Sequence, residues 1–168
     1  LIDLQERLLP AIDGAAELAE QAAWLLRLAQ RLQVPVIATE QYPKGLGHTV
    51  ADLLAAAPAA EVVEKSHFSC VAAECLPASL MAREQVIVCG METHVCVLQT
   101  VLDLLEQGRT VFVVAEAVGS RKPADKQLAL QRMQQAGAVI VSREMVAFEW
   151  LEQAGSELFR SISREFIR

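Results

Sequence analysis

The stretch Val86-Ile-Val-Cys-Gly-Met-Glu-Thr-His-Val-Cys96 decides the fold. It begins with β-branched and apolar residues that predict a buried strand, breaks at Gly90, and continues as an apolar helical pattern to residue 106. A strand that leads directly into a helix is the repeating unit of a parallel sheet. Cys96 stands at the start of this helix, where the helix macrodipole favours a negative charge.

The alternation of strand and helix extends through the whole sequence. Apolar runs that are typical of strands covered on both faces alternate with stretches of helical spacing. We therefore expect a single α/β domain over residues 1–168, with three α/β/α layers and a doubly wound, mainly parallel, six-stranded sheet of the Rossmann-like kind. The first strand opens in mid-pattern, so we expect it to be truncated. The predicted strands cover residues 1–3, 34–39, 61–64, 85–90, 110–116 and 138–142, and the predicted helices cover residues 15–32, 71–82, 94–106 and 124–136, with one or two short helices in 150–168.

The composition excludes several classes of function. The 168 residues are 53% apolar, which is enough to bury a core without disulfides or a structural metal. The formal net charge is −6 and no basic stripe is present, so we expect no nucleic-acid partner. No apolar run reaches the roughly 18 residues of a membrane span, and no export signal opens the sequence. Four cysteines without zinc spacing predict free thiols in a cytoplasmic protein.

Three ionisable side chains follow predicted strands at the end where parallel sheets bind ligands. Asp3 closes the first strand, Lys65 follows the third, and Cys96 follows the fourth. We expect them to converge on one crevice. Taken singly, each has an ordinary structural explanation: a helix cap for the carboxylate, a surface charge for the lysine, and core packing for the cysteine.

The sequence resembles the isochorismatase-like cysteine hydrolases over nearly its whole length. It is most similar to the subgroup called isochorismatase domain-containing proteins, which share a Glu-Gln-Tyr-Pro segment and a glutamate four residues before the cysteine. Besides the stretch Val86 to Cys96, the resemblance rests on Leu-Ile-Asp3-Leu-Gln, Thr39-Glu-Gln-Tyr-Pro43, Glu64-Lys65-Ser-His-Phe and Arg132-Met-Gln-Gln-Ala-Gly137-Ala.

This resemblance implies a catalytic triad of Asp3, Lys65 and Cys96. It also implies a cis peptide between Met91 and Glu92, which would aim the backbone N–H groups of Glu92 and Cys96 at an oxyanion. A cysteine attacks as its thiolate, and both a helix N-terminus and a lysine favour that anion, while the aspartate accepts the proton. By position, we expect the substrate to contact Gln5, Gln41, Tyr42, Phe68 and Arg121.

The sequence departs from the family pattern at three places, one of which is Glu116, where the family has an aspartate after the fifth strand. Nicotinamidase-like relatives carry an Asp-x-His metal motif where this chain reads Thr39-Glu-Gln-Tyr-Pro43, so we predict no metal and no other cofactor. Glu92 stands where many relatives have a small apolar residue. Its carboxylate would oppose an anionic transition state unless it forms an ion pair. Arg121 is a candidate partner, and the alternative is that Glu92 points to the solvent or to a neighbouring subunit.

The sequence predicts a metal-independent hydrolase that cleaves a small amide or related C–N bond through a thioester on Cys96. Two alternatives remain: vinyl ether hydrolysis of an isochorismate-like substrate, and a non-catalytic, redox-responsive thiol protein on the same scaffold. The resemblance implies a homo-oligomer, a dimer or higher. Two apolar clusters late in the chain fit either subunit contact or internal packing: Phe148, Trp150 and Leu151, and Phe159, Phe166 and Ile167.

Overall fold

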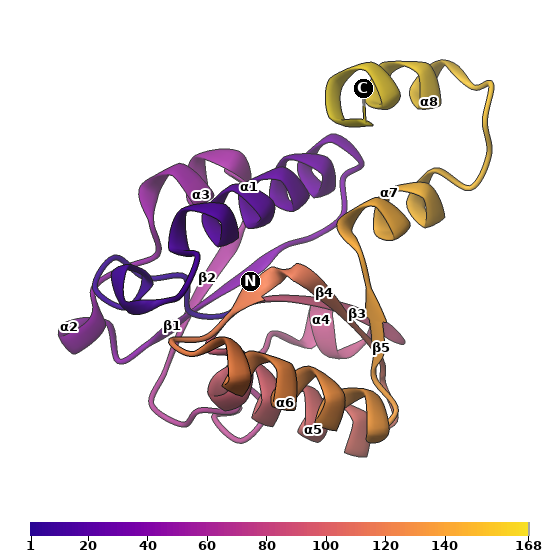
Figure 1. The fold of residues 1–168 in the computed structure, drawn as a ribbon. Helices are drawn as coiled ribbons and strands as arrows, with labels where there is room; N and C mark the ends of the chain where they lie inside the picture. The colour runs from indigo at the N-terminus through magenta and orange to yellow at the C-terminus, as the bar shows by residue number, and fades with distance from the viewer. Residues whose placement is uncertain (168) are drawn as a thin grey trace.

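The computed structural model describes residues 1–167 as a sheet between two layers of helices (Figure 1). Helices α1, α3 and α7 lie on one face of the sheet, and α5 and α6 lie on the other. The predicted three-layer α/β/α fold is confirmed. The strands are β1 (Ile37–Gln41), β2 (Glu61–Lys65), β3 (Gln85–Met91), β4 (Thr110–Gly119) and β5 (Val139–Val141). The helices are α1 (Ala15–Arg31), α2 (Pro43–Leu46), α3 (Ala51–Ala56), α4 (Ala78–Met81), α5 (Leu98–Glu106), α6 (Pro123–Gln135), α7 (Arg143–Leu151) and α8 (Glu157–Ile162).

The strands pair in parallel throughout, in two groups that the start of the chain joins. β1 pairs with β2, and β3, β4 and β5 pair in that order. Ile2 forms parallel bridges to Thr39 on one side and to Gly90 on the other, so the predicted first strand is reduced to a single bridging residue. A cavity of about 320 Å³ lies between β1 and β3 on the Leu1 side of this bridge.

The predicted helix over residues 71–82 is wrong. The chain forms turns there, and only α4, at the end of the range, is helical. Glu74 adopts a left-handed φ of 52°, which ends any helix that begins before it. Pro77 lacks an N–H and disfavours a helical conformation in the residue before it, so a new helix starts only after the proline.

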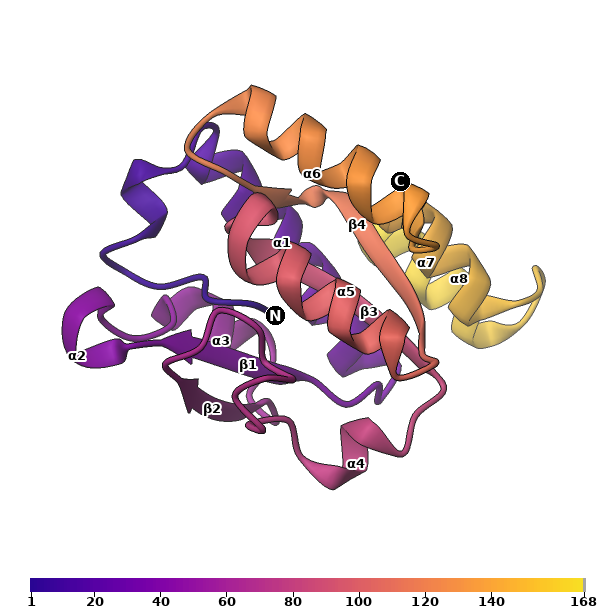
Figure 2. The same cartoon turned by 90° about the horizontal axis from the view of Figure 1, so that it is seen from below.

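The last helices pack back onto α1. The Trp24 ring meets Phe166 edge to face at a centroid distance of 5.5 Å, and the indole N–H donates to the Phe166 carbonyl at 3.1 Å. Phe159 and Trp150 pack against the same core. Seen from below, α7 and α8 lie behind the sheet on the α1 side, with α5 and α6 in front (Figure 2). Most of the late apolar residues therefore serve internal packing, although Phe148 stays exposed.

None of the helices within residues 1–167 is long and apolar enough to cross a membrane.

Candidate active site

The backbone around Gly90 brings the start of the chain to the end of β3. The N–H of Ile2 donates to the Cys89 carbonyl at 2.8 Å, and the N–H of Met91 donates to the Ile2 carbonyl at 2.8 Å. Gly90 has a φ of 124°, and a Cβ atom there would lie 2.1 Å from the Ile2 carbonyl oxygen. Only glycine allows this close approach. As a result, Asp3 lies beside the turn that carries Cys96.

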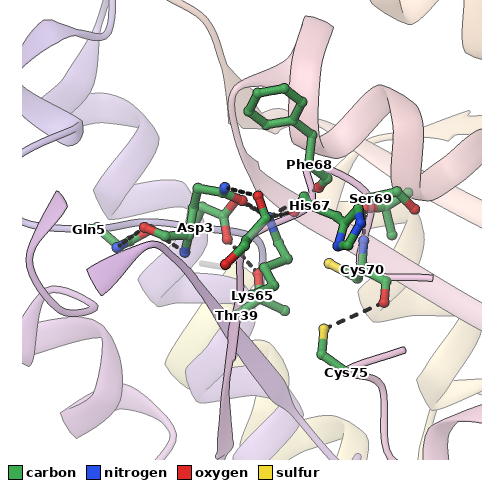
Figure 3. Close-up of polar contacts among 12 residues, drawn as sticks. Asp3, Gln5, Thr39, Lys65, His67, Phe68, Ser69, Cys70 and Cys75 are labelled. Carbon is green, nitrogen blue, oxygen red and sulfur yellow. Dashed lines mark hydrogen bonds and ion pairs between the residues drawn. The ribbon is translucent and has the colours of Figure 1, made fainter. Parts of the chain in front are cut away.

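Asp3 and Lys65 form an ion pair in the interior of the protein. The Lys65 Nζ atom lies 2.8 Å from Asp3 Oδ2, and both side chains are 0% exposed. The ammonium also donates to Gln41 Oε1 at 2.6 Å and to the Phe68 carbonyl at 3.0 Å (Figure 3). The Thr39 hydroxyl donates to Asp3 Oδ1 at 2.6 Å. Buried charges are stable only when paired and hydrogen-bonded, and both conditions hold here.

The electrostatic surroundings keep Lys65 charged. Burial is the largest single effect and lowers the pKa of Lys65, but the charge of Asp3, the nearby Cys96 and the hydrogen bond to Asp3 together outweigh it. The net result is a pKa above the usual value for lysine. The register of the sheet supports the arrangement, because Lys65 stands directly opposite Gln41 at the ends of two paired strands.

Cys96 lies in a π-helical turn, η2 (Thr93–Val97), which leads into α5. Its thiol is buried and lies close enough to Asp3 and Lys65 for both to influence its pKa. Burial raises the pKa of the Cys96 thiol, and the charge of Asp3 raises it further, against the opposing effect of Lys65. Lys65 favours the thiolate, as the sequence predicts, but burial and Asp3 outweigh it, so the pKa of the thiol lies above its ordinary value. The raised pKa favours the protonated form of the thiol, with the Asp3 carboxylate nearby.

The turn before Cys96 has the predicted backbone and places Glu92 at the site. The peptide between Met91 and Glu92 is cis. The Glu92 carboxylate pairs with Arg121, whose Nε donates to Glu92 Oε1 at 2.8 Å. The Glu92 side chain is mostly buried, whereas that of Arg121 is 58% exposed. Of the partners considered from sequence, Arg121 is the one that neutralises this carboxylate.

The two glutamines expected to contact substrate are engaged within the protein. The Gln5 amide nitrogen donates to the carbonyls of Gln41 at 3.0 Å and Gly47 at 2.6 Å, and its oxygen accepts from the Gln41 N–H at 2.8 Å. The side chain of Gln41 joins Lys65 to the Ser66 carbonyl. These contacts make both glutamines supports of the ion pair and its loops. Tyr42 and Phe68, in contrast, are exposed large hydrophobics next to the ends of β1 and β2.

Sequence reasoning did not assign a role to Thr39. Its position near the carboxyl end of β1, in the Thr39-Glu-Gln-Tyr-Pro43 motif at the ligand-binding end of the sheet, was the available signal. The close contact with Asp3 depends on the pairing of Ile2 with β1, which a sequence pattern does not reveal.

The position of the relatives' metal motif holds a polar cluster of a different kind. Buried Glu40 accepts from the Thr49 N–H at 2.7 Å and pairs with His48 Nδ1 at 2.9 Å. Among residues 1–167, no group of three His, Cys, Asp or Glu side chains is arranged to hold a metal ion. His94 points away from Cys96, with its Nδ1 atom 3.0 Å from the Ser120 hydroxyl.

Comparison with known proteins places the chain in a family. The model of the isochorismatase domain matches residues 1–145. The chain belongs to the isochorismatase family. Isochorismatase domain-containing protein 2A of Mus musculus is 40% identical over 167 residues, which cover 98% of this isochorismatase-family chain and 79% of the mouse protein.

Solved structures of related proteins share the fold of this isochorismatase-family member. The MAR1 ribonuclease of Caenorhabditis elegans is 38% identical, with a TM-score of 0.91 over 99% of this chain and 86% of that protein. The YcaC gene product of Escherichia coli, an octameric hydrolase of unknown specificity, is 27% identical, with a TM-score of 0.86 over 99% of this chain and 85% of that one.

Proposed function

We propose that this protein is a metal-independent hydrolase in which Cys96 attacks a small amide or a related C–N bond and forms a thioester. The observation that supports the proposal is the buried ion pair between Asp3 and Lys65, which lies near enough to the Cys96 thiol for both residues to influence its pKa. A carboxylate close to a thiol whose pKa is raised can serve as the general base that removes the thiol proton.

The reaction begins with transfer of the thiol proton to Asp3 as the Cys96 sulfur attacks the substrate carbonyl. The C–N bond of the tetrahedral intermediate then breaks, and the leaving amine takes the proton from Asp3. A water molecule gives a proton to the same carboxylate and attacks the thioester, and the carboxylate returns that proton to the departing sulfur. Lys65 keeps Asp3 ionised between these steps and stabilises the sulfur anion as it forms.

The backbone N–H groups of Glu92 and Cys96 are the proposed donors to the oxyanion. The pairing of Glu92 with Arg121 supports this assignment, because it removes a free negative charge from beside the developing anion. Tyr42 and Phe68 are exposed, their backbones hydrogen-bond to Lys65, and they are the proposed contacts for a flat substrate. Arg121 is exposed enough to contact a polar group of the same substrate while it pairs with Glu92.

The test is intact-mass analysis of the protein after incubation with a panel of small amides and esters. We expect an acyl adduct on the wild type and none on Cys96→Ala. Cys89→Ala is the matched control, because Cys89 is also buried but packs in a different core cluster from Cys96. An adduct that persists in Cys96→Ala, or turnover of an amide by that variant, would contradict the nucleophile assignment.

The same variants separate the alternatives. Vinyl ether hydrolysis needs no covalent cysteine step, so an isochorismate-like substrate that Cys96→Ala still consumes would favour that reading. If no amide or ester in the panel acylates the protein while peroxide oxidises Cys96 selectively, the redox-responsive alternative is favoured. One relative is called a ribonuclease, but the net charge of −6 argues against a polyanionic substrate here.

We also propose that the protein forms a homo-oligomer. The octameric YcaC protein supports this proposal, since it shares the fold over nearly the whole of this chain. Light scattering coupled to size-exclusion chromatography tests it, and a purely monomeric mass would overturn it.

A further inference from the structure

The segment between β2 and α4 carries two cysteines that the proposed reaction does not use. Cys70 is 1% exposed, and Cys75 is partly exposed. A turn closes the backbone between them, because the N–H of Cys75 donates to the Cys70 carbonyl at 3.3 Å. The Cys75 sulfur also lies 3.4 Å from this carbonyl oxygen (Figure 3). The two cysteines are thus held together by main-chain as well as side-chain contacts.

The first cysteine of this pair is anchored to α5. The N–H of Cys70 donates to the Thr100 hydroxyl at 3.0 Å, and the neighbouring Ser69 hydroxyl donates to Asp103 at 2.5 Å. The second cysteine follows Glu74, whose left-handed backbone completes the turn. The turn therefore brings the Cys75 sulfur against the backbone of Cys70, and a disulfide between near neighbours needs such proximity.

The surroundings divide the roles between the two thiols. A hydrogen bond from Cys75 lowers the pKa of Cys70 to about 7, against the effect of burial, and the charge of Lys65 adds to the lowering. The same hydrogen bond raises the pKa of Cys75. These shifts favour the thiolate on Cys70, which is the form that reacts with peroxides, with the Cys75 thiol next to it in the turn.

We propose that Cys70 and Cys75 form a reversible dithiol–disulfide site that hydrogen peroxide oxidises. The Cys70 thiolate attacks one peroxide oxygen, the O–O bond breaks, and hydroxide leaves, so that Cys70 becomes a sulfenic acid. The Cys75 sulfur then attacks the Cys70 sulfur and displaces the sulfenic oxygen as hydroxide. The Cys75 proton and a proton from solvent convert the two hydroxides to water. Two thiols are oxidised and one peroxide is reduced, and external dithiol reverses the step. This site does not depend on the proposed hydrolase activity.

Tryptic mapping tests the proposal on the full chain. Cleavage after Lys65 and Arg83 yields one peptide, residues 66–83, with Cys70 and Cys75 as its only cysteines, and the peptide of residues 84–109 carries the other two cysteines. The reduced protein is treated with equimolar hydrogen peroxide, alkylated in denaturant and digested. We expect the 66–83 peptide to lose two hydrogens and take up no alkyl group, while the 84–109 peptide takes up two. Dithiothreitol added before alkylation restores both alkyl groups to the 66–83 peptide.

Two variants show which cysteine reacts first. Cys75→Ser should stop at the sulfenic acid, which dimedone traps on Cys70, whereas Cys70→Ser should give no adduct on the 66–83 peptide. Cys89→Ser is the control and should behave as the wild type does. The proposal fails if the 66–83 peptide stays fully alkylated while the 84–109 peptide is oxidised, or if the disulfide that forms links two chains on a non-reducing gel.

Discussion

Replacing Asp3 with asparagine leaves the Lys65 ammonium buried without its counter-ion. In the folded protein this ammonium is 0% exposed and lies 2.8 Å from the Asp3 carboxylate. Asparagine has nearly the same shape, so packing is conserved and the charge alone is removed. The contacts of Lys65 with Gln41 and with the Phe68 carbonyl remain, but neither partner carries a charge.

The magnitude follows from the burial of the pair. Removing one partner of a buried ion pair destabilises a protein by about 3 to 5 kcal/mol. Replacing both partners with uncharged side chains is often close to neutral, so the double variant with Asp3→Asn and Lys65→Met should be more stable than Asp3→Asn alone. Both variants are made in a Cys96→Ala background, because a Cys96 thiolate would otherwise replace the lost carboxylate beside the ammonium.

The pH dependence has a definite sign. In the wild type, the raised pKa of Lys65 gives stability that is complete below the unfolded pKa, about 10.4, and is lost as the pH rises through the folded value. Without Asp3, burial is left to lower this pKa. The unfolded state then binds more protons than the folded state does, so the variant should gain stability as the pH rises from about 7 to about 10.

The assay is urea unfolding at these two pH values, followed by circular dichroism. We expect a lower midpoint for the Asp3→Asn variant at neutral pH and a smaller deficit at alkaline pH. Two results would refute the idea that the pair holds a buried charge. One is an Asp3→Asn variant with the same urea midpoint as the Cys96→Ala background at both pH values. The other is a double variant that is less stable than Asp3→Asn alone.

Three further predictions concern the backbone, the nucleophile and the rim of the site. Gly90→Ala should lower the free energy of unfolding by about 3 kcal/mol or more, because its Cβ would lie 2.1 Å from the Ile2 carbonyl oxygen. Gly108→Ala is the control: this glycine has a φ of 79° but open space around it, so the loss in the same urea assay should be only about 1 kcal/mol. The rate of Cys96 alkylation by iodoacetamide, followed by peptide mapping, should keep rising with pH beyond the point where a free thiol, with a pKa of about 8.5, levels off. The reason is that burial and a neighbouring carboxylate raise the pKa of Cys96. A rate that levels off near neutral pH would contradict this. Arg121→Ala should destabilise the protein by about 1 to 3 kcal/mol, because it leaves the mostly buried Glu92 carboxylate unpaired. It should also lower kcat, because that charge opposes the oxyanion, and raise KM for any substrate that the arginine contacts. An unchanged KM across the panel would remove Arg121 from the substrate site.

Much of the fold could be predicted from the sequence because it depends on local patterns. The apolar runs and the helical spacing are properties of neighbouring residues, and they placed β2, β3 and α1 within about two residues of their observed bounds. The predicted helix over residues 71–82 failed because its composition is helical, whereas the backbone of Glu74 and the missing N–H of Pro77 end the pattern.

The sequence by itself determined which residues stand at the ends of the strands, and therefore that Asp3, Lys65 and Cys96 occupy one edge of the sheet. It also determined the family, through motifs spread along the chain. Only the tertiary structure decided what these residues do to one another. The ionisation of Cys96 depends on burial and on the distance to two charges, and the support of Asp3 by Thr39 depends on Ile2 entering between β1 and β3. Such effects arise between segments that are far apart in the chain, because electrostatic energy depends on distance in space and on exclusion of water.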